Sequence, residues 1–113
     1  MYYTYMLRCK DKSIYTGITT NIDRRMKEHF SKDEKCAKYT LTHTAEKLEC
    51  AWQTETRALA SKLEFYIKRL TKIKKEELIL NDNLQELIDK IDATKYERYR
   101  INKFKKINIP FLD

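Results

Sequence analysis

Strand-forming residues dominate the start of the chain. Residues 2–9 are dense in aromatic and other strand-favouring types, and a polar turn at residues 11–13 separates them from a second short run at residues 14–18. Two strands this close in sequence pair antiparallel, because a parallel pairing needs a crossover of about a dozen residues. The pattern therefore predicts a β-hairpin.

An apolar stripe with helical spacing follows the hairpin. Ile22, Met26 and Phe30 recur every four residues, and Asn21 before them is a favourable N-cap. We predict a helix at about residues 21–30. Residues 31–47 are polar and mixed, and they could hold a short helix whose ends the pattern leaves open.

Alternation with a period of two returns at residues 48–54. Leu48, Cys50 and Trp52 occupy every second position there, which predicts a third strand with these three side chains on one buried face. The sheet that we expect therefore has three strands.

From Thr56 onward the apolar period lengthens to that of a helix. The apolar side of the predicted long helix carries Leu59, Leu63, Tyr66, Ile67 and Leu70. A second helical pattern covers residues 74–90, with a break expected near residues 81–83.

The tail at residues 95–106 is basic and aromatic, and it allows two interpretations. Tyr96, Tyr99 and Phe104 lie among Lys and Arg, a composition suited to stacking on nucleic acid. Their near-helical spacing favours instead an amphipathic helix packed against the domain. Pro110 then ends regular structure.

The length of 113 residues suits one hydrophobic core rather than two. The fold class that these elements predict is α/β, a single domain with a sheet of three strands. We expect residues 1–80 to form the domain. Residues 81–113 are expected to be a helical, basic C-terminal extension that packs on the domain or follows it.

Charge changes the picture by suggesting a partner. The chain has 24 Lys and Arg against 17 Asp and Glu, a net charge of +7 and a pI near 9.3. Such a field attracts polyanions and weakens with salt, so nucleic acid is the first partner to test. The alternative is that the lysines only keep the protein in solution.

Cysteine usage and the N-terminus predict the compartment. Cys9, Cys36 and Cys50 are odd in number and lack the spacing of a zinc site or a disulfide framework. The start of the chain lacks the pattern of a signal peptide, and no apolar run reaches the about 18 residues of a membrane helix. We expect a cytoplasmic protein with reduced thiols and no membrane partner.

A short motif carries the chemistry. Tyr3-Thr4-Tyr5 is followed, after nine residues, by Tyr15-Thr16-Gly17, and the next helix bears Arg25 and His29. This arrangement resembles the signature of the GIY-YIG nucleases, in particular their small stand-alone bacterial members, and the resemblance covers residues 2–79. The first triplet lacks the Gly and Ile of the family motif and retains its tyrosine, and the second has Thr16 where Ile is usual.

The resemblance implies a GIY-YIG fold, in which helices flank a three-stranded antiparallel sheet. It also implies one divalent metal ion and hydrolysis of phosphodiester bonds in DNA, in repair or processing. Carried over by position, the catalytic residues are Tyr5, Tyr15, Arg25, His29 and Glu64. Glu64 would hold Mg²⁺, with Mn²⁺ as a possible substitute, because both prefer oxygen ligands.

The resemblance also suggests a role for each of the other four residues. Tyr15 would accept the proton of the attacking water, with a nearby cation favouring the phenolate. Arg25 would bind the scissile phosphate through paired hydrogen bonds. His29 would orient a tyrosine or relay a proton, and Tyr5 would hydrogen-bond phosphate or water.

Further residues are expected to contact substrate. The resemblance places Gly17 in this group, together with the run Lys38, Tyr39 and Thr40, which could equally be an ordinary connecting segment. His43 and Asn81 are weaker candidates and stay outside the expected site.

Structural roles compete with the catalytic ones. Strand tyrosines usually pack, Arg25 and His29 could be a solvated helix face, and Glu64 could pair with Lys68 four residues on. Two other functions therefore stay open: a nucleic-acid-binding module without hydrolytic activity, and a protein-interaction adaptor with an unidentified protein partner.

Overall fold

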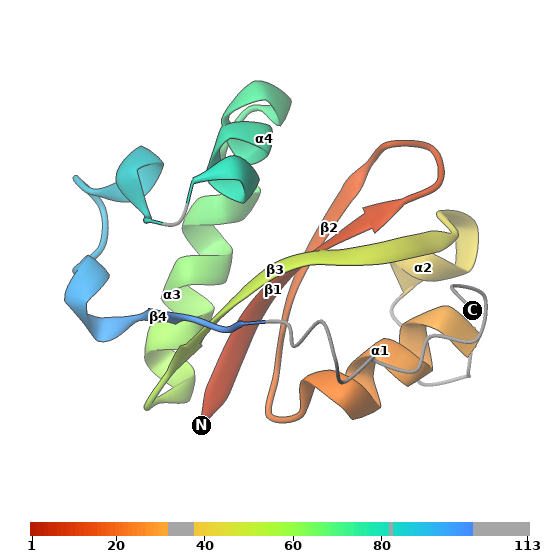
Figure 1. Ribbon diagram of the computed structural model, residues 1–113, viewed down its shortest axis with the longest axis horizontal. Helices are drawn as coiled ribbons and strands as arrows, with labels where there is room; N and C mark the ends of the chain where they lie inside the picture. The colour runs from red at the N-terminus through yellow and green to blue at the C-terminus, as the bar shows by residue number, and fades with distance from the viewer. Residues whose placement is uncertain (32–37, 82, 101–113) are drawn as a thin grey trace.

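The sheet is four-stranded and antiparallel throughout. The computed structural model describes residues 1–31, 38–81 and 83–100. Its strands are β1 (Tyr2–Cys9), β2 (Ile14–Thr19), β3 (Ala45–Thr54) and β4 (Glu97–Arg98), in the order β2-β1-β3-β4 (Figure 1). The prediction of three strands was one short. The fourth contributes only two residues, too few for periodicity to reveal, and it pairs with Trp52 and Gln53.

The predicted hairpin is confirmed. Its turn closes with hydrogen bonds from Cys9 N to Ser13 O and from Lys12 N to Cys9 O, both 2.9 Å long, and Lys12 has a φ of 74°. In the register between β1 and β2, Tyr5 faces Gly17 and Leu7 faces Tyr15. Because side chains alternate along a strand, Tyr5 and Tyr15 lie on the same face of the sheet.

Side-chain caps set the starts of the helices. The helices are α1 (Ile22–Ser31), α2 (Lys38–Thr42), α3 (Arg57–Lys68) and α4 (Lys72–Leu80). Asn21 Oδ1 accepts a hydrogen bond from Arg24 N at 3.0 Å, as its N-cap role predicts. Thr56 caps α3 by accepting from Leu59 N at 3.1 Å.

The helical stretch expected at residues 74–90 is shorter than predicted. α4 ends at Leu80, and Asn81 after it has an extended backbone, with ψ of 140°. Two short 3₁₀ turns follow, η1 (Gln85–Leu87) and η2 (Ala93–Lys95). Their apolar residues Leu84, Leu87 and Ile91 still pack into the core, so burial rather than helical periodicity explains this part of the pattern.

The helix expected in the tail is wrong over residues 95–100, which are largely extended. Two tyrosines of this segment nevertheless pack against the domain. The Tyr96 hydroxyl donates to Leu59 O at 2.7 Å, and the Tyr99 ring lies edge-on to Tyr3, with centroids 5.3 Å apart. Phe104 and Pro110 lie outside the described residues.

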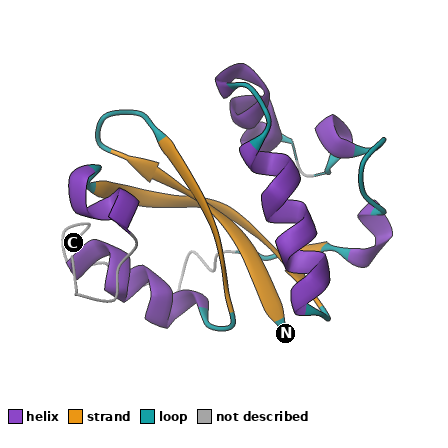
Figure 2. Cartoon of the chain, turned by 180° about the vertical axis from the view of Figure 1, so that it is seen from behind, coloured by secondary structure: helices purple, strands orange, loops and turns teal. Residues whose placement is uncertain are grey.

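Two apolar clusters form the core, one on each face of the sheet (Figures 1 and 2). The cluster beneath α3 and α4 includes Met6, Cys50, Trp52, Leu63 and Ile67. The cluster beneath α1 includes Tyr5, Leu7, Met26, Phe30 and Leu48.

Leu48 does not share a face with Cys50 and Trp52 as predicted. The β1–β3 register shifts between Met6, which faces Cys50, and Leu7, which faces Leu48. The extra residue, Glu49, reverses the alternation and turns Leu48 toward α1. A bulge of this kind leaves no trace in the hydrophobic pattern.

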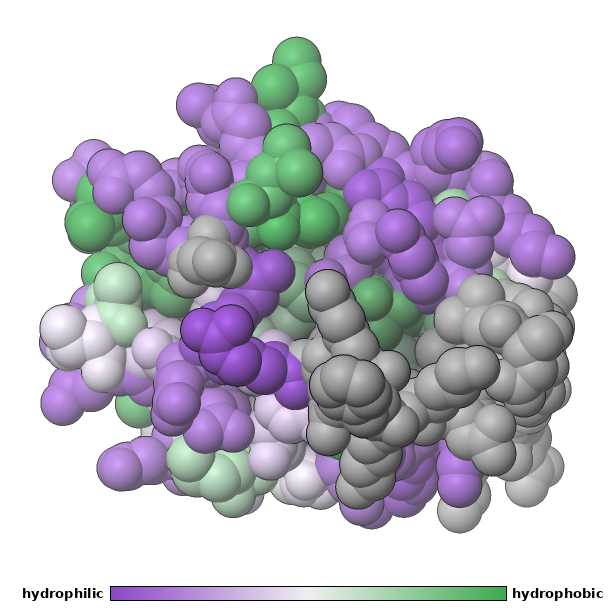
Figure 3. Space-filling view, viewed as in Figure 1, coloured by the Kyte–Doolittle hydropathy of each residue, from purple (hydrophilic) through white to green (hydrophobic). Residues whose placement is uncertain are grey.

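Polar side chains cover most of the face shown in Figure 3, and apolar ones gather near α4. Ile73 and Leu80 of this helix are 71% and 83% exposed. Cys9 and Cys50 are buried free thiols, and Cys36 lies outside the described residues. Within the described ranges, no helix combines the length and apolar character needed to cross a membrane.

Candidate active site

Tyr5 is the buried centre of the candidate site. Its side chain is 0% exposed, and its hydroxyl lies 2.6 Å from Nε2 of His29, which is also 0% exposed. Tyr5 comes from the central strand β1 and His29 from the last turn of α1. The hydrogen bond therefore ties the helix to the sheet.

Gly17 makes room for Tyr5. A Cβ atom at this position would lie 2.7 Å from the Tyr5 hydroxyl oxygen, 2.8 Å from Cζ and 3.0 Å from Tyr15 Cε2. These distances are shorter than atoms tolerate, so the Tyr5 ring can lie across β2 only because its strand partner has no side chain. Since β2 is an edge strand, the Tyr5 hydroxyl is directed toward an edge of the sheet.

His29 is held at both ring nitrogens. Its Nδ1 lies 3.0 Å from the hydroxyl oxygen of Thr40, a buried residue of α2. Burial, aided by the positive charge of Arg25, lowers the pKa of His29 to about 4. The ring is therefore neutral at physiological pH, with one nitrogen donating and the other accepting.

The Tyr5 hydroxyl stays protonated. Burial raises its pKa well above the ordinary value for tyrosine, and the nearby Tyr15 and Glu64 act in the same direction. The Arg25 guanidinium opposes this rise through hydrogen bonding and charge. With Arg25 as a donor to the Tyr5 oxygen, the Tyr5 proton is directed to His29 Nε2, and His29 Nδ1 then donates to Thr40.

Tyr15 is half-buried and lies at the outer side of this group. Its ring centroid is 5.3 Å from that of His29, 6.1 Å from Tyr5 and 5.4 Å from Tyr39 of α2. Tyr39 in turn stacks on His43 at 4.1 Å. The Tyr15 ring is thus braced from two sides while part of it stays open to solvent.

A hydrogen-bonded pair supports the outer end of this aromatic row. His43 Nδ1 lies 2.5 Å from Asp11 Oδ2, in the hairpin turn. Hydrogen bonds from Ser13, followed by His43, hold the pKa of Asp11 well below its usual range. The pair links α2 to the hairpin, which is a structural role for His43.

Arg25 projects from α1 one turn before His29. Its side chain is 20% exposed, and its Nη1 forms an ion pair with Glu28 Oε1 at 2.7 Å. The guanidinium carries five N–H donors, so one ion pair does not exhaust its capacity to bind. Arg25 is therefore a cation that contacts the buried tyrosine on one side and reaches solvent on the other.

Glu64 approaches from α3, on the other face of the sheet. Its negative charge helps to raise the pKa of Tyr5, less than burial and Tyr15 do. The ion pair with Lys68, which the sequence offered as the alternative to a metal role, is present. Lys68 Nζ lies 3.4 Å from Glu64 Oε2. The Glu64 side chain is 23% exposed, so its carboxylate is accessible to an ion as well as to Lys68.

The donor set suits one kind of metal ion. Among the residues that the structure describes, no three His, Cys, Asp or Glu side chains are grouped to enclose a metal. Mg²⁺ and, by the same oxygen preference, Mn²⁺ need fewer protein ligands, because Mg²⁺ keeps several of its waters. A single accessible carboxylate such as Glu64 fits that requirement.

The residues expected to contact substrate divide into two kinds. Lys38 is exposed and Tyr39 is half-buried, so both can be reached from solvent. Gly17 and Thr40 are buried, and their part in substrate binding stays a prediction. Thr40 also fixes His29, a role that the sequence did not reveal because residues 29 and 40 belong to different helices.

The fold and site together define a class of protein. A family model described as the GIY-YIG catalytic domain matches residues 1–77. The chain therefore carries the domain of the GIY-YIG nuclease superfamily, and the structure places the motif tyrosines side by side on β1 and β2.

Relatives narrow this class to one family. The chain is 46% identical over 78 residues to the UPF0213 protein FN1575 of Fusobacterium nucleatum, covering 69% of this chain and 76% of that protein. It is 40% identical over 87 residues to the UPF0213 protein CPE1444 of Clostridium perfringens, covering 76% and 90%. The protein belongs to the UPF0213 family of small stand-alone GIY-YIG proteins.

A solved structure is also similar. The solution NMR structure of the UPF0213 protein BH0048 from Bacillus halodurans is 38% identical, with a TM-score of 0.47, and the match covers 82% of this chain and 99% of that one.

Proposed function

We propose that this protein is a divalent-metal-dependent endonuclease that hydrolyses phosphodiester bonds in DNA, in repair or processing. The observation that carries the proposal is the convergence on the Tyr5 hydroxyl. His29 bonds to it at 2.6 Å, and the charges of Arg25 and Glu64 both act on it. The Tyr5 hydroxyl, beside an edge strand, is thus under the influence of a cation and of a carboxylate that could hold a metal.

Phosphodiester hydrolysis needs an activated water and neutralisation of the charge that develops at phosphorus. Glu64 would hold Mg²⁺ or Mn²⁺. When bound, such an ion neutralises phosphate charge and makes a water more acidic. The basic character of the chain, with a net charge of +7, favours approach of the polyanionic substrate.

Arg25 and Tyr15 are partly exposed and would contact the substrate directly. Arg25 would bind the scissile phosphate through its guanidinium N–H groups, as a planar fork matches two phosphate oxygens. Tyr15, half-buried and braced by Tyr39, would take the proton of the attacking water.

Tyr5 and His29 would act through their neighbours. Both are fully buried, so neither can contact a phosphate without a rearrangement. The protonated Tyr5 hydroxyl keeps Arg25 in place, and the neutral His29 ring supports Tyr15 at 5.3 Å. Their function in the proposal is to hold the phosphate-binding and proton-accepting groups in one geometry.

Cleavage of labelled DNA and RNA substrates with Mg²⁺ or Mn²⁺ tests the proposal. The panel includes duplex, single-stranded, flapped and branched forms, with Glu64→Gln in parallel because Gln is isosteric but a poor metal ligand. We expect metal-dependent cleavage of a DNA by the wild type and equal binding without cleavage by Glu64→Gln. Binding by both proteins with no cleavage of any substrate would overturn the enzyme and favour a binding module.

A further inference from the structure

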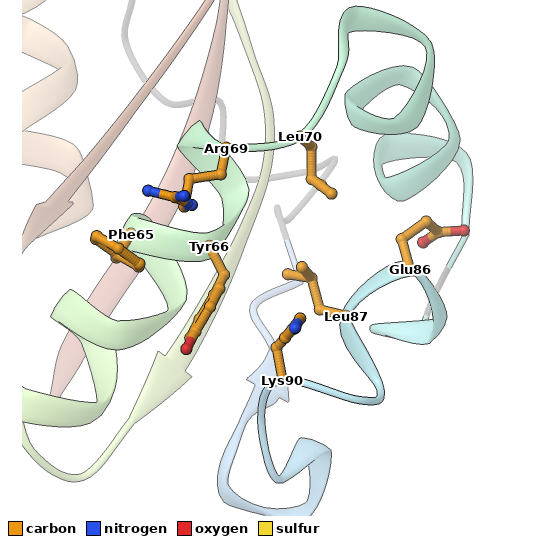
Figure 4. A pocket seen from close by; sticks show the side chains of 7 residues that line it. All are labelled: Phe65, Tyr66, Arg69, Leu70, Glu86, Leu87 and Lys90. Atoms are coloured by element: carbon orange, nitrogen blue, oxygen red, sulfur yellow. The ribbon is translucent and has the colours of Figure 1, made fainter.

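A second concave site lies beside α3, away from the tyrosines. The pocket has a volume of about 450 Å³, within the roughly 300–1,000 Å³ typical of sites that hold small organic groups. Figure 4 shows that α3 and the turn after it supply one wall and the η1 region the other. The principal lining residues are Phe65, Tyr66, Arg69, Leu70, Leu87 and Lys90.

An exposed aromatic side chain marks this pocket. Phe65 is 52% exposed, whereas Leu63 and Ile67 of the same helix are fully buried. The guanidinium of Arg69 lies 5.1 Å from the centroid of the Phe65 ring. The Tyr66 ring stands edge-on to Phe65 at 5.1 Å. An aromatic ring with an arginine beside it is a surface on which nucleobases stack.

The charges of the pocket favour an anionic partner. Within the described part of the chain, neither Arg69 nor Lys90 has an ion-pair partner, so both contribute uncompensated positive charge. Glu86 is the acidic residue of the lining, and its Oε2 accepts a hydrogen bond from Asn81 Nδ2 at 2.6 Å. Two cations against one tethered carboxylate leave the rim positive, which matches the phosphate of a nucleotide.

The pocket and Glu64 both border the exposed side of α3. Phe65 follows Glu64 directly, and each helical residue advances by about 100° around the axis. Around the exposed side of α3, Lys68 lies next to Glu64. Phe65 and Arg69 lie beyond Lys68 and form part of the pocket wall. A DNA strand with a phosphate at Arg25 and the Glu64 metal could therefore cross α3 and enter the pocket.

We propose that this pocket binds an unpaired nucleobase of the DNA strand held at the active site, with its phosphate at Arg69 and Lys90. The inference rests on the proposed function and deepens it, because it specifies DNA with a single-stranded portion as the preferred substrate. A base inside a duplex is stacked and paired, so it could not enter a pocket on the protein surface without being unpaired.

Binding in the absence of metal tests the pocket separately from catalysis. Fluorescence anisotropy in EDTA would compare a duplex bearing a short single-stranded extension, of either polarity, with the same DNA whose extension is abasic. The two DNAs carry the same phosphates, so their ratio of Kd values isolates the contribution of the bases.

We expect the wild type to bind the base-bearing extension about tenfold more tightly than the abasic one, since stacking of one base on an aromatic contributes roughly this factor. Phe65→Ala should abolish the preference and Phe65→Tyr should retain it. Arg57→Ala removes an exposed cation from the same helix outside the pocket, and it should leave the ratio unchanged.

A ratio near one in the wild type, or an undiminished ratio in Phe65→Ala, would overturn the pocket assignment. If the ratio behaves as expected while no DNA is cleaved with Mg²⁺ or Mn²⁺, the pocket stands and the nuclease proposal fails. Cleavage with no preference for bases in the extension would support the nuclease proposal and overturn the pocket assignment.

Discussion

The candidate site has an inner and an outer group, and the two differ in almost every physical property. The inner group, Tyr5, His29 and Thr40, is 0% exposed and linked by hydrogen bonds of 2.6 and 3.0 Å. The outer group, Tyr15, Arg25 and Glu64, comes from three different elements and is partly exposed, with 20% for Arg25 and 23% for Glu64.

The difference in charge is equally clear. In the inner group, burial keeps His29 neutral and Tyr5 protonated. The outer group has a permanent cation and a carboxylate, each with a neighbour on its own helix as ion-pair partner, Glu28 and Lys68. In the proposed function, the buried neutral group positions the reaction without taking part in it, and the accessible charged group binds phosphate and metal.

The largest effect is expected from removing the cation of the outer group. Arg25→Ala should lower the single-turnover rate of DNA cleavage by about a hundred- to a thousandfold, the usual consequence of losing a group that stabilises developing charge. Arg24→Ala is the matched control, since Arg24 is the adjacent, exposed arginine of α1. Similar losses in both variants would show that Arg25 acts only through the overall positive charge.

The inner group predicts a dependence of stability on pH. The pKa of His29 is about 4 in the folded protein and about 6.5 when unfolded. Because the unfolded state binds the proton first, the stabilisation is complete above pH 6.5 and is lost as the pH falls toward 4. We expect a decrease of about 2 to 3 kcal/mol in the free energy of unfolding across this interval.

Urea denaturation at several pH values between 7 and 4 would measure this decrease. His29→Gln, which cannot titrate, is the control and should remove most of the slope in this interval, although it starts from a lower stability. An unchanged slope in His29→Gln would mean that other groups cause the loss of stability in acid. It would also mean that folding does not lower the pKa of His29.

A smaller loss of stability is expected at Gly17, where the inner and outer groups meet. Gly17→Ala places a methyl group 2.7 Å from the Tyr5 oxygen and 3.0 Å from Tyr15, so both rings must shift. The free energy of unfolding should fall by about 1–3 kcal/mol. Tyr5→Phe removes the nearest clashing atom, so the double variant should be more stable than the sum of the single effects predicts. Strict additivity would contradict the close packing.

The sequence allowed much of this arrangement to be predicted. The hairpin, the helix capped by Asn21 and the long helix after Thr56 follow from local patterns, and the tyrosine motif pointed to the family. Tyr5 and Tyr15 share a face because the short turn fixes their register. These are the parts of the molecule in which local sequence decides structure.

What could not be predicted depends on contacts between distant segments. The bulge at Glu49 turned Leu48 to the other face, and the two-residue strand β4 forms only by pairing with β3. The support that Thr40 gives to His29 joins α2 to α1 across residues 32–37, and no periodicity relates the two positions. Apolar residues after Leu80 were recognised as buried, but their 3₁₀ and extended backbone was not.

The most direct test of the division between the two groups is the rate of DNA cleavage by Tyr15→Phe. Tyr2→Phe removes the same hydroxyl from another half-buried strand tyrosine and serves as the control. If Tyr15 accepts the proton, Tyr15→Phe should bind DNA within about twofold of the wild type but cleave it at least about a hundredfold more slowly, with Tyr2→Phe unaffected. Cleavage by Tyr15→Phe at the wild-type rate would contradict the account.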